Sequence, residues 1–337
     1  MKCWRMNELG DPWALLKMEE LNLPAVNGDQ IKISVEAADL NFADILQCQG
    51  RYQVKLDPPF TPGMTAAGKI IECSPNSKFK IGERVCGPTF SSFGGFAQEA
   101  LLDESQCQLI PKSVPSKTAA ALHVTYSTAW FALKRRGRLK SGETILILAG
   151  AGGVGSAAIE IAKNLGSWII AAASDARKLQ ACKELGADEI INYEEEDLYD
   201  RVMSLTDNRG VDIVYDPVGG RFFDPARRTV AWEGRYLVIG FANGEIPKAP
   251  LNHALVKNYS IVGVHMGGYR YNKPQPIEDC FEELYWQATT GDINPLIDRT
   301  VAINALPSAL EDLANRKSIG RLAVSYTHLT LPTNTVV

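Results

Sequence analysis

The chain has 337 residues, which is more than a single hydrophobic core normally organises and suits two domains. Hydrophobic residues make up 45% and charged residues 22%, and the net charge of −4 gives no reason to expect binding to nucleic acid or to an acidic membrane surface. No apolar stretch reaches the length of a membrane span, and the seven scattered cysteines are typical of reduced thiols. We therefore expect a cytoplasmic protein without membrane or nucleic-acid partners.

Residues 1–122 have a residue pattern that is typical of a compact, β-rich domain. Short strand-like runs alternate with Pro, Gly and Asn, as at residues 30–35, 68–73 and 83–86. This region is predicted to be the first part of a domain built from both ends of the chain.

Residues 144–155 carry the most specific motif. The apolar run 144–149 predicts a buried parallel strand, Gly150-x-Gly152-x-x-Gly155 follows it at once, and residues 156–163 continue with helical spacing. A strand, a glycine turn and a helix form the phosphate-binding corner of a dinucleotide fold. In this corner the pyrophosphate lies on free N–H groups at the positive end of the helix dipole.

Strands and helices alternate from residue 123 to residue 262. Further strands are predicted at 168–173, 189–192, 211–215, 235–239 and 260–263, and helices at 176–185 and 198–205. This order predicts an α/β fold in which a doubly wound parallel sheet is inserted into the β-rich domain. Residues 263–324 are expected to complete that domain, with helices at 277–290 and 308–315 and a strand at 321–324. Residues 325–337 are Thr-rich and read as a disordered or foreign tail.

Ordered motifs along nearly the whole chain resemble the medium-chain dehydrogenase/reductase superfamily, in its zinc-independent, zeta-crystallin-like NADPH:quinone oxidoreductase branch. They are Asn41-Phe42-Ala43-Asp44, Gly50-Arg51-Tyr52, Pro62-Gly63-Met64, Gly94-Gly95-Phe96, Val124-Thr125-Tyr126, Leu185-Gly186-Ala187-Asp188 and Val262-Gly263-Val264-His265. The resemblance implies a GroES-like catalytic domain around a Rossmann domain. It also implies a homodimer paired through an edge strand, for which residues 260–264 are the candidate.

The positions that match the zinc ligands of alcohol dehydrogenases are Asn41, Met64 and Val124. An amide, a thioether and an alkyl group do not make the thiolate and imidazole site that zinc prefers, so no metal is expected. The resemblance then implies hydride transfer from NADPH to a small acceptor that is already electrophilic, such as a quinone or an enone. An enoyl-thioester or enone reductase and a non-catalytic NADPH-binding protein are the alternatives.

For the cofactor, the glycine motif supplies Gly150, Gly152, Gly153, Val154 and Gly155. The resemblance adds Ser174, Lys178, Tyr193 and Arg316 as ligands of the NADPH 2′-phosphate, since hydroxyl donors and cations suit a dianion. The alternative is that Lys178 belongs to a solvated helix face and Asp175 holds the ribose of NAD.

At the nicotinamide end, the resemblance implies contacts from Asn41, Thr128, Gly240, Phe241 and Val264. Asn41, Tyr52 and Asp44 are the candidate catalytic residues. Tyr52 would donate a hydrogen bond to the acceptor oxygen, while a structural hydrogen bond is an equal alternative for Asp44 and a helix cap for Asn41. Thr65 departs from the family, which usually has an acidic residue there.

Overall fold

The computed structural model describes residues 1–90 and 92–326, and the chain forms two compact units. Unit 1 comprises residues 1–124 together with the chain from Ile297 onward, and unit 2 comprises Thr125–Leu296. Across the described residues, no helix combines the length and the apolar character needed to span a bilayer.

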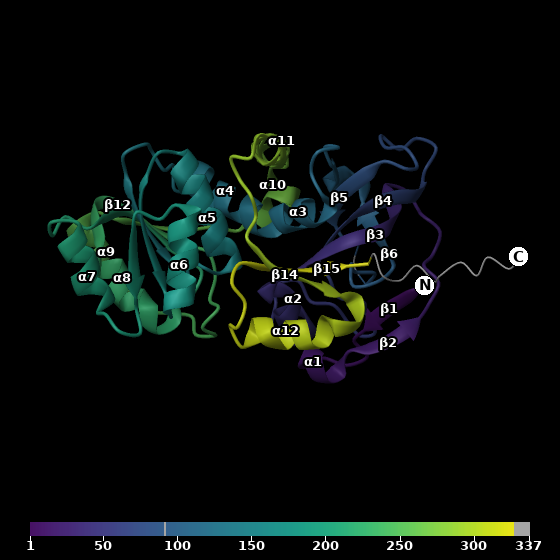
Figure 1. The fold of residues 1–337 in the computed structure, drawn as a ribbon, viewed down its shortest axis with the longest axis horizontal. Coiled ribbons are helices and arrows are strands. Elements are labelled where there is room, and N and C mark those ends of the chain that lie inside the picture. The colour runs from purple at the N-terminus through teal and green to yellow at the C-terminus, as the bar shows by residue number, and fades with distance from the viewer. Residues whose placement is uncertain (91, 327–337) are drawn as a thin grey trace, which may run out of the picture. The chain divides into compact units, whose positions relative to one another are not determined.

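Unit 2 is built on a six-stranded parallel sheet (Figure 1). Its strands lie in the order β10-β9-β8-β11-β12-β13, and all five pairings are parallel. Their bounds are β8 Thr144–Leu148, β9 Trp168–Ala173, β10 Glu189–Asn192, β11 Val211–Asp216, β12 Val230–Val238 and β13 Ser260–Gly263. This arrangement confirms the predicted doubly wound sheet, in which the order reverses between β8 and β11.

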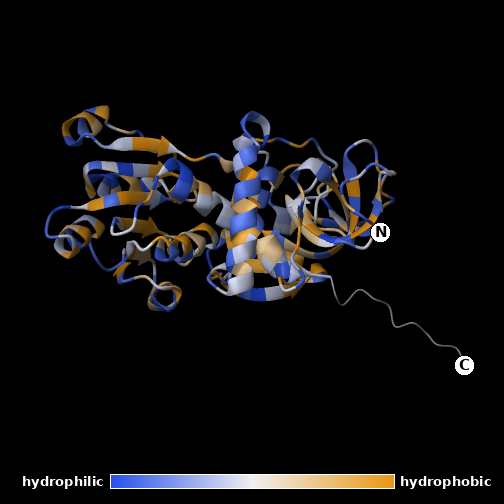
Figure 2. Ribbon diagram, turned by 90° about the horizontal axis from the view of Figure 1, so that it is seen from above, coloured by the Kyte–Doolittle hydropathy of each residue, from blue (hydrophilic) through white to orange (hydrophobic). Residues whose placement is uncertain are grey.

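Helices cover both faces of this sheet (Figure 1). They are α5 Gly153–Asn164, α6 Ala176–Leu185, α7 Leu198–Leu205, α8 Phe223–Arg228 and α9 Leu251–Lys257. Figure 2 shows hydrophilic and hydrophobic residues following one another along helices of the chain. In α6 and α7 the buried residues are Leu179 and Cys182, and Leu198 and Val202, as expected for helices with one buried face. Side-chain caps fix two of the starts, because Asp175 accepts from the Lys178 N–H and Asp197 accepts from the Asp200 N–H.

The rest of unit 2 is helical and changes the predicted division of the chain. Helix α4 (Ser127–Trp130) lies between two π-helical turns, Leu122–Tyr126 and Phe131–Arg136. After the short α10 (Tyr269–Asn272), α11 (Gln275–Thr290) packs on α4, where Trp130 Nε1 donates to Glu283 Oε2 (2.9 Å). Residues 263–296 therefore pack within unit 2, and the chain returns to unit 1 at Ile297 rather than at residue 263.

Unit 1 is organised around the long strand β3 (Gln30–Leu40). Its sheet has the order β14-β15-β3-β4-β5-β7, and β6 also pairs with β3. The bounds are β4 Thr65–Cys73, β5 Arg84–Pro88, β6 Glu99–Asp103, β7 Gln108–Leu109, β14 Ile297–Ala302 and β15 Arg321–Ser325. A separate hairpin pairs β1 (Lys2–Arg5) with β2 (Lys17–Glu20), and the helices are α1 Pro12–Leu15, α2 Phe42–Cys48, α3 Ser116–Ala121 and α12 Leu306–Ala314. Because β15 pairs antiparallel with β3, both ends of the chain form one sheet.

The predicted tail begins two residues too early. Ser325 is the last residue of β15, and Tyr326 is buried, with its hydroxyl donating to the carbonyl of Gly95. These two residues belong to the folded unit because they extend the sheet and fill its core. Residues 327–337 lie outside the described part of the chain.

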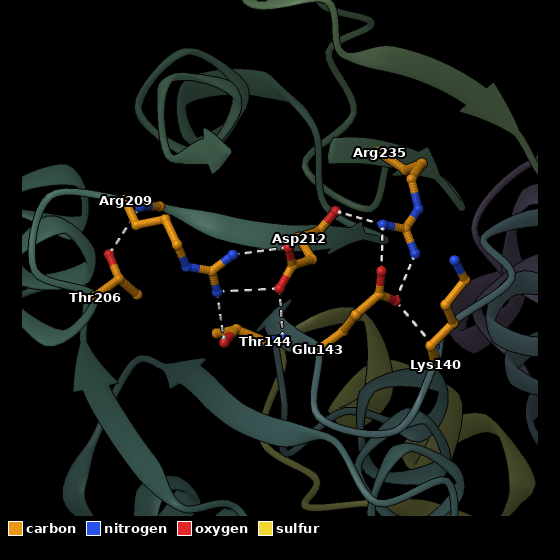
Figure 3. Close-up of polar contacts among 8 residues, drawn as sticks. Lys140, Glu143, Thr144, Thr206, Arg209, Asp212 and Arg235 are labelled. Atoms are coloured by element: carbon orange, nitrogen blue, oxygen red, sulfur yellow. Dashed lines mark hydrogen bonds and ion pairs between the residues drawn. The ribbon is translucent and has the colours of Figure 1, made fainter. Parts of the chain in front are cut away.

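A polar network joins the amino ends of β8 and β11 to Arg235 in β12 (Figure 3). Arg235 forms two bonds with Glu143, Nη1 to Oε1 (2.9 Å) and Nη2 to Oε2 (2.7 Å). Arg209 holds both carboxylate oxygens of Asp212, and Asp212 Oδ2 accepts from the Thr144 N–H (2.8 Å). The network ties three neighbouring strands together at the edge of the sheet opposite their carboxyl ends.

Candidate cofactor and active site

The glycine loop connects β8 to α5 in unit 2. The N–H of Gly150 donates to Ala172 O on the neighbouring strand (3.0 Å), and Gly152 is the N-cap of α5. A Cβ on Gly155 would lie 2.2 Å from Ala149 O, so helix and strand end approach as closely as glycine allows. Ala149 itself adopts a left-handed conformation with φ of 49°.

The outer side of this loop is open. A Cβ on Gly152 would meet a single heavy atom within 4 Å, Ala149 O at 3.2 Å. Gly153, Val154 and Gly155 form the first turn of α5, whose N–H groups have no partners within the helix. Exposed backbone donors at a helix N-terminus fit a pyrophosphate.

The carboxyl end of β9 carries the residues predicted for the 2′-phosphate. Lys178 Nζ lies 2.9 Å from Ser174 Oγ and 3.2 Å from Asp175 Oδ2. The Asp175 carboxylate also accepts from the Lys178 N–H (3.0 Å) and from Ser174 Oγ (3.1 Å), and despite the cost of partial burial these bonds lower its pKa. Asp175 is thus the cap of α6, which favours that structural role over the alternative of a free ribose ligand.

Two further predicted ligands lie in different units. Tyr193 follows β10, its N–H donates to Ala173 O (3.2 Å), and its ring centroid is 4.5 Å from that of Phe222. The backbone of Tyr193 therefore lies beside Ala173, the last residue of β9, and Ser174 is the next residue of the chain. Arg316 follows α12 in unit 1, in a left-handed conformation with φ of 58°.

Asp216, which the sequence did not single out, organises the carboxyl ends of β11 and β12. Its Oδ1 accepts from the N–H groups of Val218 (2.7 Å) and Gly219 (2.9 Å), and its Oδ2 accepts from Tyr236 Oη (2.5 Å). Its carbonyl accepts from the N–H groups of Ile239 and Gly240. The loops that contain the predicted Gly240 and Phe241 are held by this one buried residue, whose pKa is raised by desolvation.

On the neighbouring strand, the N–H of Val264 donates to Val238 O (3.0 Å). Val264 therefore also lies at the carboxyl edge of the sheet, directly after the end of β13. The predicted Thr128 lies in α4, half-buried.

In unit 1, Asn41 and Asp44 lie at the start of α2 and form a capping box. The Asn41 N–H donates to Asp44 Oδ2 (2.8 Å), and the Met64 N–H donates to Asp44 Oδ1 (2.9 Å). Asp44 is fully buried, and desolvation raises its pKa to about 7. Because both oxygens hold backbone N–H groups, the geometry favours the structural alternative for Asp44 over a catalytic role.

Asn41 is also bound by an arginine from the other end of the chain. Arg321, the first residue of β15, donates from Nη2 to Asn41 Oδ1 (2.7 Å) and to Leu40 O (2.7 Å). Its Nε donates to Asp39 Oδ1 (3.0 Å), and Nη2 also pairs with Asp39 Oδ2. Asp39 is fully buried and Arg321 nearly so, and desolvation raises the pKa of Asp39 to about 6 although Arg321 opposes it.

Tyr52 and Thr65 are the other two residues of unit 1 that the sequence singled out. Tyr52 is half-buried, and its N–H donates to Leu46 O (3.1 Å) at the end of α2. Thr65, which stands where the family usually has an acidic residue, is buried, and its Oγ1 has no hydrogen-bond partner among the described residues.

All seven cysteines are free thiols. Burial raises the pKa of the Cys48 thiol, so Cys48 beside Asp44 is poorly suited to act as a thiolate nucleophile. In the described residues, no group of three or more His, Cys, Asp or Glu side chains is placed to hold a metal ion.

Comparison with known proteins decides the family. The model "Zinc-binding dehydrogenase" matches residues 153–283, and "Alcohol dehydrogenase GroES-like domain" matches residues 27–112. Quinone oxidoreductase-like protein 2 of Bos taurus is 37% identical over 312 residues, which are 92% of this chain and 89% of the relative. The chain belongs to the medium-chain dehydrogenase/reductase superfamily.

Within this superfamily the chain falls in the quinone oxidoreductase branch, so the predicted family and fold class are confirmed. A quinone oxidoreductase of Pseudomonas syringae pv. Tomato superposes with a TM-score of 0.90 at 28% identity, covering 96% of this chain and 99% of the other. A mycobacterial protein solved with NADPH superposes with a TM-score of 0.88 at 25% identity, covering 97% and 100%. The protein is an oxidoreductase of a family that depends on nicotinamide cofactors.

Proposed function

We propose that this protein transfers a hydride from NADPH to a quinone or a similar carbonyl-conjugated acceptor without a metal. The observation that carries the proposal is that the chain has a dinucleotide-binding loop but lacks the zinc-ligand residues of alcohol dehydrogenases. The dinucleotide loop is complete and open around Gly152, whereas the three positions that match zinc ligands hold Asn41, Met64 and Val124. An acceptor that no metal polarises must already be electrophilic, as a quinone is.

The choice of NADPH over NADH depends on the carboxyl end of β9. Lys178 and Ser174 offer an ammonium and a hydroxyl 2.9 Å apart, which suits a phosphate dianion. The acidic residue there, Asp175, is engaged by three donor groups from Ser174 and Lys178. A carboxylate engaged in this way is a poor ligand for the ribose 2′-hydroxyl of NAD. Tyr193, whose backbone lies beside the end of β9, belongs to the same proposed site. Arg316, in unit 1, is proposed as a ligand of the 2′-phosphate from the resemblance alone.

When bound, NADPH supplies the hydride from its nicotinamide ring. The residues of the chain position and stabilise the reactants: the first turn of α5 binds the pyrophosphate, and Asp216 orders the loops of Gly240 and Phe241. Thr128 and the backbone of Val264 contact the nicotinamide end. Asn41 and Tyr52 donate hydrogen bonds to carbonyl oxygen, where negative charge develops during reduction. In this proposal the completing proton comes from solvent.

A homodimer is part of the proposal. β13 is the edge strand of its sheet, and Ile261 on it is 38% exposed. Beside it in the chain, α9 exposes Leu251, Leu255 and Val256, each at 70% or more. An unpaired edge strand and an exposed apolar helix are features that association with a second copy would cover.

An enoyl-thioester reductase is the second candidate, and one observation favours it. A shallow, open surface pocket of about 290 Å³ at the end of β13 is lined by Arg136, His265 and Lys273, among others. Arginine and lysine side chains around a surface pocket suit the phosphates of coenzyme A.

The deciding experiment follows NADPH consumption by the purified protein, with an ortho-quinone and an enoyl-coenzyme A in parallel and NADH as the control. Turnover of the quinone alone supports the proposal, and turnover of the thioester alone replaces it with the second candidate. A preference for NADH would refute the phosphate site at Lys178. Cofactor binding without turnover of either acceptor would indicate a non-catalytic NADPH-binding protein.

A further inference from the structure

Asn41 has a fixed hydrogen-bonding direction. The guanidinium of Arg321 lies 2.7 Å from one terminal atom of the Asn41 amide. A guanidinium donates and never accepts, so this atom must be the oxygen, and the amide cannot be flipped without facing donor with donor. Arg321 thereby determines which end of the amide is available to a ligand.

The other end of the amide is a donor, Nδ2, whose present partners both belong to Asp39. Asn41 Nδ2 makes one long bond, 3.4 Å, to the carbonyl of Asp39, close to the limit of a hydrogen bond. Its other contact is with the side chain of Asp39, a carboxylate that Arg321 already engages through Nε and Nη2. Asn41 is only 3% exposed, so a ligand carbonyl oxygen, rather than bulk water, is the partner that would give this donor a shorter hydrogen bond.

The arginine is itself held rigidly. Asp39 accepts from both Nε and Nη2 in a bidentate pair, and the carbonyl of Leu40 accepts from Nη2 as well. β15 pairs with β3 in the register Leu322 to Leu40, which places Arg321 at the end of β3, just before α2. A planar guanidinium fixed at two of its nitrogens, Nε and Nη2, has a defined orientation, unlike an ammonium group.

We propose that Arg321 is a positioning residue: it binds Oδ1 of Asn41 and so leaves the N–H groups of that amide to bind a carbonyl oxygen. The carbonyl belongs either to the nicotinamide carboxamide or to the acceptor, which share this chemistry. The inference rests on the proposed function, because it assigns Asn41 to a ligand of that reaction.

The decisive variant is Asn41→Asp, which keeps the shape and the oxygen bound by Arg321 but replaces the donor Nδ2 with an acceptor oxygen. Asp caps helices as well as Asn does, so α2 still begins in place. We expect kcat/KM with the preferred acceptor to fall about 100-fold, the usual scale for a lost donor at a developing negative charge. The exposed Asn76→Asp introduces the same charge in a loop and should leave kcat/KM and the melting temperature unchanged.

A second variant tests Arg321 directly. Asp39→Asn with Arg321→Met removes both charges together, so that neither is left buried and unpaired. With the amide no longer oriented, we expect kcat/KM to fall about tenfold, while the Kd of 2′,5′-ADP, which reports on the phosphate end, stays unchanged. In Asn41→Asp, a raised Kd for NADPH identifies the carboxamide as the partner, whereas an unchanged Kd with lowered kcat/KM identifies the acceptor.

The outcomes separate this inference from the proposed function. Wild-type protein without turnover of any acceptor overturns both. An active wild type whose Asn41→Asp variant, or whose folded double variant, keeps full activity overturns the role of Arg321 and leaves the proposed function standing.

Discussion

Replacing Gly155 with alanine tests the geometry of the dinucleotide loop. The added Cβ would lie 2.2 Å from Ala149 O and 2.9 Å from both Ala149 C and Gly150 Cα. All three atoms are backbone, so no side chain can rotate away. To restore a tolerable carbon–oxygen separation near 3 Å, α5 and the end of β8 must move apart by about 0.8 Å.

The size of the effect follows from two opposing contributions. Overpacking of this kind usually lowers the free energy of unfolding by about 1–3 kcal/mol, and rigid backbone on both sides points to the upper end. Alanine gains up to about 1 kcal/mol over glycine in a helix, which offsets part of the loss. We expect a net loss of about 2 kcal/mol and, because the first turn of α5 is displaced, at least a tenfold weaker binding of NADPH.

Gly152→Ala separates stability from binding. Its Cβ would meet only Ala149 O, at 3.2 Å, and the φ of −80° suits alanine. Stability should change by less than about 1 kcal/mol, whereas NADPH binding should weaken at least tenfold because the methyl group occupies the side that the pyrophosphate approaches. Gly263→Ala, where no atom lies within 4 Å of the added Cβ, is the control for stability.

Urea unfolding followed by circular dichroism and fluorescence titration with NADPH measure the two effects. A Gly155→Ala variant that unfolds at the wild-type urea concentration and binds NADPH normally would refute the close approach of helix and strand. A Gly152→Ala variant with wild-type affinity would show that the pyrophosphate does not approach this backbone.

Three further predictions concern charged residues. The pKa of Asp44 is raised in the folded state, so its stabilising contribution is present below pH 3.8 and lost as the pH rises through about 7. The free energy of unfolding of the wild type should therefore fall between pH 5 and 8, by up to about 4 kcal/mol. In Asp44→Asn, urea titrations across this range should show a smaller fall. Lys178→Ala should raise the Kd of NADPH about tenfold and leave that of NADH unchanged, whereas Lys183→Ala on the same helix should change neither. Arg235→Met leaves Glu143 without its partner and should lower the melting temperature, at a cost of about 2 kcal/mol, while a changed Kd for NADPH would contradict its structural role.

Local signals in the sequence were sufficient for most elements of unit 2. Helix α6 begins and ends as predicted, because Asp175 caps its first turn and Gly186, with a φ of 110°, ends it. The short apolar runs of β9, β10 and β13 also have their predicted bounds. Helix α9 was not predicted, because its apolar residues Leu251 and Leu255 are exposed and do not mark a buried face.

In the candidate site, some contacts could not be predicted from local sequence patterns. The glycine loop is local and could be predicted, whereas the pairing of Asp39 with Arg321 joins residues 282 positions apart and has no local pattern. Asp216 likewise depends on Tyr236 and on two loops that meet only when the strands align. Long-range polar contacts of this kind follow from strand register, which the composition of a single strand does not specify.

The antiparallel pairing of β15 with β3 has a consequence for synthesis of the protein on the ribosome. Residues 125–296 form a compact unit whose contacts are complete before β15 is made, so they can fold while translation continues. Unit 1 must wait, because β3, already paired with β4 and β6, receives its third partner β15, and Asp39 its counter-charge, only after residue 321 has been synthesised. Until then the nascent chain carries an open strand edge and a carboxylate that has no cation, which makes the first domain to be translated the last one to mature.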